Sequence, residues 1–221
     1  MTLVSIPTDE EASPEARVIF KHSRKMFGRV ANAVRVASHS PRAAQSIFGF
    51  IVAIARQEIT GEVDKQTKAL IIIKTSMLNS CSYCIGHNLT FGKAAGLSDE
   101  QIAILDGDYL NSELFTPGQR AALAWSEYLT ERTHRSHPEA MVNLKAHYSE
   151  AQIIEITMLC GQTNFWNRLT DGLKIDMEDV EVQNLFVKSR SIDVADYVAY
   201  MKDCWWNDSD AASNAPRQAA E

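Results

Sequence analysis

The feature that most constrains the fold is a helix-start signal that recurs along the chain. A serine or threonine is followed three residues later by glutamine at Ser98–Gln101, Thr116–Gln119 and Ser149–Gln152. In this capping box the hydroxyl and the glutamine side chain bond backbone N–H groups that the first turn of a helix leaves unpaired. The strand-like run Ile71–Ile73 has flanks that continue a helical pattern without turn residues. The sequence therefore predicts an all-α fold.

Other start and stop signals divide the rest of the chain into helices. Serine followed by proline is a typical helix start, and glycine is a typical stop. Asp64 stands before an apolar segment and is a further N-cap. The helix that follows Asp64 carries the most apolar run of the chain, so we expect this helix to be central to the core. These signals predict helices from Ser13-Pro14 to Gly28, from Arg42 to Glu58 after Ser40-Pro41, from Asp64 to Asn79, and from Cys81 to Ala95 before Gly96.

Length and composition predict one domain. The chain has 221 residues, of which 45% are hydrophobic, enough for a full core. We expect a single helical domain over residues 1–206. Residues 207–221 are small and polar, which predicts a mobile tail.

Charge and hydropathy exclude several partners. A net charge of −6 without a dense Lys/Arg cluster argues against nucleic-acid binding. No apolar run approaches the roughly 20 residues needed to cross a bilayer, so no membrane association is expected. The first residues lack the basic and apolar regions of a signal peptide. Four unevenly spaced cysteines are too few for a disulfide scaffold. Together these features predict a cytoplasmic protein.

The segment with the clearest chemical potential is Asn79–Asn88, which holds Cys81, Cys84 and His87 at spacings of three. At this helical spacing Cys84 lies between the other two groups and can contact both. Two thiols so placed can form a disulfide, and a nearby imidazole can take a thiol proton and stabilise the reactive thiolate.

Two further features could favour the thiolate. Asn79-Ser80 could break the helix, so that the cysteines lie at a new helix start with free backbone donors. Lys74, two turns before Cys81, could add a positive charge nearby.

These residues resemble a known family. The order of an apolar helix, Leu78–Cys81, Tyr83-Cys84 and a histidine within a turn is similar to the AhpD-like, or carboxymuconolactone decarboxylase, superfamily. A later segment, Ile153–Leu169, is similar to the second half of its peroxidase-related members. The resemblance implies an AhpD-like multi-helix bundle that forms homo-oligomers, as trimers, hexamers or dimers.

The resemblance also implies roles for the site residues. In the peroxidase branch the second cysteine attacks a hydroperoxide, the first resolves the sulfenic acid as a disulfide, and a histidine–glutamate pair relays the proton. Here Cys84 would attack, Cys81 would resolve and His87 would carry the proton. An external dithiol would reduce the pair, and no bound cofactor or metal would be needed.

The chain departs from the family pattern at two positions. The usual histidine position holds Asn88, and His87 comes one residue early. The usual relay glutamate, twelve residues before Cys81, is replaced by Ala69. We therefore expect another carboxylate, Glu155 or Glu62, to orient His87. Asn88 and Tyr83 are further candidates for supporting roles.

Other functions fit the same residues. A lactone decarboxylase or isomerase of the superfamily would use a histidine or glutamate to move protons, with Lys74 and Arg168 as candidate cations for substrate carboxylates. A non-catalytic helical binding or assembly protein that has lost the relay is a third interpretation, supported by Ala69. Zinc binding by Cys81, Cys84 and His87 lacks an obvious fourth ligand. A thiol-dependent hydroperoxidase is the function that the sequence favours.

Overall fold

The computed structural model describes residues 1–187 and 191–208, without the side chains of residues 184, 186 and 187. Every regular element within these residues is helical, so the predicted fold class is confirmed there. The predicted tail over 207–221 lies outside the described residues except for its first two positions. The helices are α1 Pro14–Phe27, α2 Asn32–Ala37, α3 Pro41–Ala55, α4 Gln57–Thr60, α5 Lys65–Leu78, α6 Ser82–Ala95, α7 Asp99–Ala103, α8 Pro117–Glu131, α9 Pro138–His147, α10 Glu150–Gly172, α11 Val180–Val187 and α12 Val194–Asp203.

Predicted caps define several of the helix ends. The boxes at Ser98, Thr116 and Ser149 form with both of their hydrogen bonds. Ser13 caps α1, and Gly28 ends it in the left-handed conformation that glycine adopts without strain. The helix expected over 42–58 ends earlier, at Ala55, because Arg56 is extended and α4 begins after it.

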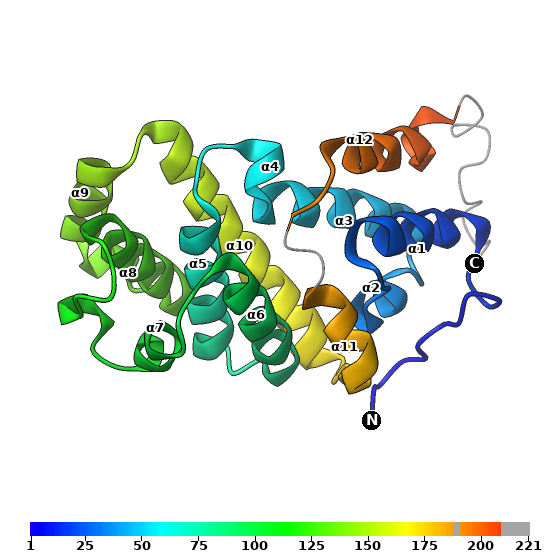
Figure 1. The fold of residues 1–221 in the computed structure, drawn as a ribbon, viewed down its shortest axis with the longest axis horizontal. Helices are drawn as coiled ribbons and strands as arrows, with labels where there is room; N and C mark the ends of the chain where they lie inside the picture. Colours follow the sequence, from blue (N-terminus) through cyan, green and yellow to red (C-terminus); the bar gives the residue numbers. More distant parts are fainter. Residues whose placement is uncertain (188–190, 209–221) are drawn as a thin grey trace, which may run out of the picture.

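Helix α5 lies at the centre of one half of the molecule, as its apolar run predicts. All residues from Thr67 to Ser76 are buried. Ile71 and Ile72 pack with α8, α9 and α10, whereas Leu70 and Ile73 pack with α6, α7 and α8. Figure 1 shows α5 between α8, α10 and α6. This helix therefore holds α6 in place.

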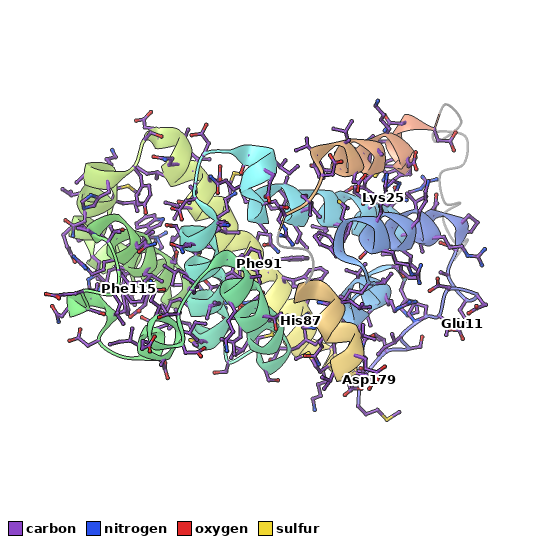
Figure 2. The ribbon with its side chains drawn as sticks, viewed as in Figure 1. Glu11, Lys25, His87, Phe91, Phe115 and Asp179 are labelled. Atoms are coloured by element: carbon purple, nitrogen blue, oxygen red, sulfur yellow. A yellow bond between two sulfur atoms is a disulfide. The ribbon has the colours of Figure 1, made fainter. Side chains whose placement is uncertain are left out.

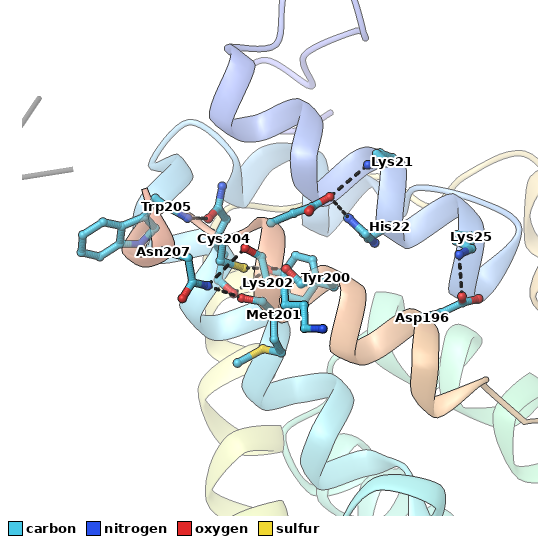
Figure 3. Close-up of polar contacts among 12 residues, drawn as sticks. Lys21, His22, Lys25, Asp196, Tyr200, Met201, Lys202, Cys204, Trp205 and Asn207 are labelled. Carbon is cyan, nitrogen blue, oxygen red and sulfur yellow. Dashed lines mark hydrogen bonds and ion pairs between the residues drawn. The ribbon is translucent and has the colours of Figure 1, made fainter. Parts of the chain in front are cut away.

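A second core joins the first helices to the last one. Phe20 on α1, Phe48 on α3 and Tyr200 on α12 are buried together, and Figure 1 shows α12 beside α1 and α3. The fully buried Tyr200 donates its hydroxyl hydrogen to the Gln45 carbonyl at 2.5 Å. Lys21 and His22 contact Asp203 at 2.9 and 2.8 Å (Figure 3).

We expect Tyr200→Ala to lower the free energy of unfolding by about 3–5 kcal/mol, because it leaves a large cavity between three helices. Chemical denaturation measures this change. Val198→Ala is the matched control, since Val198 lies on the same helix but is 43% exposed, and its effect should stay within about 0.5 kcal/mol. Equal effects of the two substitutions would contradict the packing of α12 onto this core.

Candidate active site

The cysteine pair lies at the start of α6, after a break in the chain. Helix α5 ends at Leu78, and Ser80 has a positive φ of 51°. Cys81 is the N-cap of α6, and its sulfur accepts a hydrogen bond from the Cys84 N–H at 3.2 Å. The predicted break at Asn79-Ser80 is therefore present, and the helix begins one residue later than expected. The free N–H groups of a helix start stabilise a thiolate.

The two cysteines are joined as a disulfide, with their Cα atoms 5.3 Å apart, a separation that suits such a bond. Thr170 on α10 contacts both sulfurs: its Oγ1 is 3.0 Å from Cys84 Sγ and 3.2 Å from Cys81 Sγ. Cys81 and Cys84 are 1% and 3% exposed. A substrate must therefore reach the sulfurs through an internal cavity.

His87, one turn after Cys84 on α6, lies between an arginine and a carboxylate. Its Nε2 is 2.6 Å from Glu178 Oε2, and its Nδ1 is 2.6 Å from Arg29 Nη2. A guanidinium can only donate hydrogen bonds, so Nδ1 accepts from Arg29 and Nε2 carries the hydrogen that faces Glu178. The imidazole is thus neutral and oriented while the disulfide is closed.

Glu178 precedes α11 and contacts three earlier segments of the chain. It accepts hydrogen bonds from the Tyr83 hydroxyl at 2.8 Å and from the Asn32 backbone N–H at the start of α2. Arg29 Nη1 lies 3.3 Å from its second oxygen. Burial raises the pKa of Glu178, but its close contact with His87 and the hydrogen bonds from Asn32 and Tyr83 lower that pKa to about 2. Glu178 is therefore ionised.

Tyr83 stays a protonated phenol in this site. Burial and the Glu178 charge raise the pKa of Tyr83 well above its ordinary value. Its hydroxyl oxygen also accepts from the Ala33 N–H at 3.1 Å, and its ring packs against His87 with centroids 4.5 Å apart. Tyr83 therefore holds both Glu178 and the histidine ring.

A cavity of about 180 Å³ opens onto Cys84 and His87. It lies between α1, α2, α3, α6 and α10, and Figure 2 shows His87 and Phe91 along the α6 side. Its walls are mainly apolar, with a few polar side chains near the cysteines and at Arg56. The lining includes the apolar residues Phe27, Phe48, Val52, Phe91 and Trp166 and the polar residues Arg29, Arg56, Asn88 and Asn167.

Asn88, the second predicted supporting residue, lies on the side of α6 that faces α5. Its amide donates to Ser76 Oγ at 3.0 Å, and Asn167 of α10 donates to the same oxygen at 3.2 Å. Both asparagines line the cavity. Asn88 therefore links α6 to α5 and α10, and it occupies the position at which the family pattern has histidine.

Two predicted supporting residues lie elsewhere. The Lys74 ammonium contacts Glu127 Oε2 at 2.8 Å and the Leu105 carbonyl at 2.9 Å, and not the cysteines. Glu155 is paired with Lys68 at 2.5 Å and accepts from Thr60. The carboxylate beside His87 is Glu178, and not Glu155 or Glu62 as the sequence suggested. Glu178 is 95 residues beyond Tyr83 and carries no motif, so no local pattern identifies it.

Among the described residues, no group of three or more His, Cys, Asp or Glu side chains is arranged to hold a metal ion. In the same part of the chain, no helix has the length and apolar character required to cross a bilayer.

The fold and site define an all-helical protein with a CxxC cysteine pair beside a histidine–carboxylate pair. Residues 42–128 match the carboxymuconolactone decarboxylase family model. The uncharacterized protein YdfG of Bacillus subtilis is 27% identical over 109 residues, covering 49% of this chain and 74% of YdfG. The part of the chain that matches this family model includes Cys81, Cys84 and His87.

Solved structures share this fold. An Agrobacterium tumefaciens protein, for which a role as the antioxidant defence protein AhpD has been suggested, is 26% identical with a TM-score of 0.58, over 65% of this chain and 96% of its own. A peroxidase-related protein of Ralstonia eutropha with an AhpD core is 17% identical with a TM-score of 0.70, over 87% and 98%. The debrominase Bmp8, as a cysteine-to-alanine variant in complex with 2,3,4-tribromopyrrole, is 19% identical with a TM-score of 0.67, over 86% and 98%.

Glu178→Gln should lower the free energy of unfolding by an amount that depends on pH. The folded pKa, about 2, lies below the ordinary value of 4.5, so ionised Glu178 stabilises the fold above pH 4.5 and loses this effect as the pH falls toward 2. Two and a half pKa units correspond to a difference on the order of 3 kcal/mol at neutral pH.

Urea denaturation of wild type and variant at several pH values between 7 and 2.5 measures this dependence. Val180→Ala is the control: it alters an exposed neighbour without a titrating group, so its effect should not change with pH. A Glu178→Gln effect that stays constant across this range would contradict the ionised carboxylate.

Proposed function

We propose that this protein is a thiol-dependent hydroperoxidase. The observation that carries the proposal is the position of Cys84: it lines the cavity, lies in the first turn of α6 and is bonded to Cys81, while His87 on the next turn is paired with Glu178. This arrangement combines a stabilised nucleophile, a resolving thiol and a proton carrier.

In the proposed first step the Cys84 thiolate attacks one oxygen of a hydroperoxide ROOH. The O–O bond breaks, Cys84 becomes a sulfenic acid, and the alkoxide takes one proton and leaves as the alcohol ROH. His87 supplies that proton after taking it from the Cys84 thiol. Because Nε2 faces Glu178, Nδ1 is the atom that receives it, and Arg29 must release Nδ1 during the reduced part of the cycle.

In the second step the Cys81 thiol attacks the Cys84 sulfenic acid, forms the disulfide and releases water. An external dithiol then reduces the disulfide by thiol–disulfide exchange, and no bound cofactor takes part. Glu178 balances the charge of the imidazolium in each cycle. It supplies the carboxylate that is missing at position 69, where the fully buried Ala69 packs in the core.

The cavity supports a second candidate substrate class. Aromatic side chains at Phe27, Phe48, Phe91 and Trp166 line the space in front of Cys84, which suits a planar ring. The fold is shared with the debrominase Bmp8, so an aryl halide is the alternative to a hydroperoxide. A lactone with carboxylates has less support, because exposed Arg168 bonds Asn164 and Lys74 bonds Glu127.

The protein is also proposed to form homo-oligomers through α10. Ile154, Met158 and Phe165 are 58%, 43% and 47% exposed and follow one another at helical spacing along a single face. Gly161 lies between them with open space above it. A second copy of the chain would cover this stripe. Localisation in the cytoplasm stays a prediction from the sequence.

Cysteine substitutions should separate the two thiol roles. Cys84→Ser should abolish reduction of cumene hydroperoxide in the presence of dithiothreitol. Cys81→Ser should accumulate a sulfenic acid on Cys84, since no thiol adjoins it to resolve the oxidised sulfur. Coupled peroxide assays and mass spectrometry with dimedone trapping measure these outcomes. Turnover by Cys84→Ser at the wild-type rate would exclude Cys84 as the nucleophile.

Glu178→Gln should lower kcat/KM for the hydroperoxide by about 10- to 100-fold, because the imidazolium loses its counter-charge and orientation. Glu62→Gln is the matched control: Glu62 is exposed on the loop before α5, and its substitution should leave kcat/KM within about twofold of wild type, as surface changes usually do. Equal rates for both variants would remove Glu178 from the mechanism.

The exposed apolar stripe on α10 predicts that copies of the chain associate through this helix. Met158→Glu should shift the protein toward smaller species in light scattering after size-exclusion chromatography, because it puts a charge into an apolar contact. Val142→Glu places the same charge at a residue of α9 that is 68% exposed and should not change the mass. A wild-type protein that is monomeric at micromolar concentration would refute this assembly.

A further inference from the structure

Gln162 on α10 is a buried amide that lines the cavity. The residue is 9% exposed, and its side chain makes no hydrogen bond to any residue within 1–187 and 191–208. Two lining residues of the same helix are paired: Thr163 Oγ1 donates to the Leu159 carbonyl at 2.8 Å, and Asn167 Nδ2 donates to Ser76 Oγ at 3.2 Å. Buried amides almost always have hydrogen-bond partners, because the loss of contact with water is otherwise unfavourable. The Gln162 amide is therefore available to a molecule in the cavity.

Gln162 lies about two helical turns from the reactive sulfurs along α10. Thr170 Oγ1 contacts both sulfurs, 3.0 Å from Cys84 Sγ and 3.2 Å from Cys81 Sγ. Gln162 precedes Thr170 by eight residues in the same unbroken helix (Figure 1), which corresponds to about 12 Å along the helix axis. The lining of the cavity includes residues of α10 from Gln162 to Asn167. The cavity thus follows α10, with the sulfurs toward one end and the free amide toward the other.

The chemistry of the amide indicates which ligand group it fits. Its nitrogen carries two donor hydrogens, and its oxygen is an acceptor. A neutral amide can replace the water around a neutral polar group, but it cannot compensate the hydration that an ion loses. The two arginines of the lining, Arg29 and Arg56, have contacts of their own, and Val52 and Ile72 add apolar wall from α3 and α5. The cavity therefore matches an apolar molecule with an uncharged donor–acceptor group away from its reactive end.

We propose that Gln162 is a substrate-binding residue, which selects apolar substrates that carry an uncharged carboxamide-like group at the end opposite their reactive group. For the hydroperoxidase, on which this inference rests for its chemistry, the substrate class is an apolar organic hydroperoxide with such a distal group. Gln162 takes no part in bond breaking. The ROOH group is converted to ROH at Cys84 and water leaves when the disulfide forms, while the amide of Gln162 keeps its hydrogen bonds to the distal group.

Binding can be tested without turnover. The probes are 4-isopropylbenzamide and 4-isopropylacetophenone, titrated into the disulfide form by calorimetry; the ketone has a methyl group in place of the amide NH2. The measured quantity is the Kd of the ketone divided by the Kd of the amide. Comparing this ratio between wild type and a variant cancels the hydration of the free probes. We expect Gln162→Leu to lower the ratio at least about fivefold, because the N–H groups of the bound amide then lose their acceptor.

Two further variants keep this test decisive. Gln162→Met retains the length of the side chain without its polar atoms, so it should lower the ratio as much as Gln162→Leu and replaces that variant if it does not fold. Asn143→Leu removes an exposed amide from α9 and should leave the ratio within about twofold of wild type.

Three outcomes would overturn the proposal. The first is a ratio that survives loss of the Gln162 amide, including the case in which Gln162→Leu changes the mass in light scattering because the amide bonds to a second copy of the chain. The second is an equal fall of the ratio in Asn143→Leu. The third is binding of neither probe to wild type.

Kinetics separate this inference from the proposed function. The reactive pair is 4-(2-hydroperoxypropan-2-yl)benzamide and 4-(2-hydroperoxypropan-2-yl)acetophenone, each with dithiothreitol as reductant. A higher kcat/KM for the amide that is lost in Gln162→Leu supports both proposals. A kcat/KM ratio that is the same in wild type and Gln162→Leu supports the hydroperoxidase but refutes selection by Gln162. If neither compound is reduced, the hydroperoxidase fails, and the calorimetric comparison still decides whether Gln162 binds the carboxamide.

Discussion

The site depends on one buried carboxylate. Glu178 contacts Arg29 between α1 and α2, the backbone of Asn32 at the start of α2, and Tyr83 and His87 on α6. An ionised carboxylate in a buried position is stable only when hydrogen bonds and opposite charges replace water. These four partners supply them, and in doing so they fix α2 and α6 to the segment before α11. Loss of the carboxylate would leave Arg29 buried beside an imidazole.

The helices could be predicted because their end signals are local. A cap needs only a side chain and backbone donors within four residues, so Ser98, Thr116 and Ser149 identify their helices without knowledge of the rest of the fold. The early end of α3 at Ala55 could not be seen in this way. Arg56 leaves the helical conformation and lies against Phe27 and Phe91, residues far away in the sequence.

The cluster of Cys81, Cys84 and His87 could likewise be predicted, since its three residues lie on adjacent turns, but the carboxylate partner of His87 could not. The sequence shows that the usual glutamate is absent at Ala69, and the carboxylates expected to replace it were Glu62 or Glu155. Glu155 is instead bound to Lys68, which is fully buried and would otherwise be an uncompensated charge. Electrostatic pairing in the core therefore decides which glutamate remains for the histidine. This pairing can be recognised only in the three-dimensional structure.

The position of Glu178 explains why His87 can be one residue earlier than in the family pattern. A carboxylate at position 69 would lie on α5, whereas Glu178 approaches α6 from the side of α2 and α11. Consecutive residues on a helix differ in direction by about 100°, so a histidine at 87 faces a different neighbour from one at 88. Asn88 instead donates to Ser76 on α5. The two departures from the family pattern are therefore consistent with each other: moving the histidine by one residue turns it away from α5 and toward the carboxylate that replaces the one missing there.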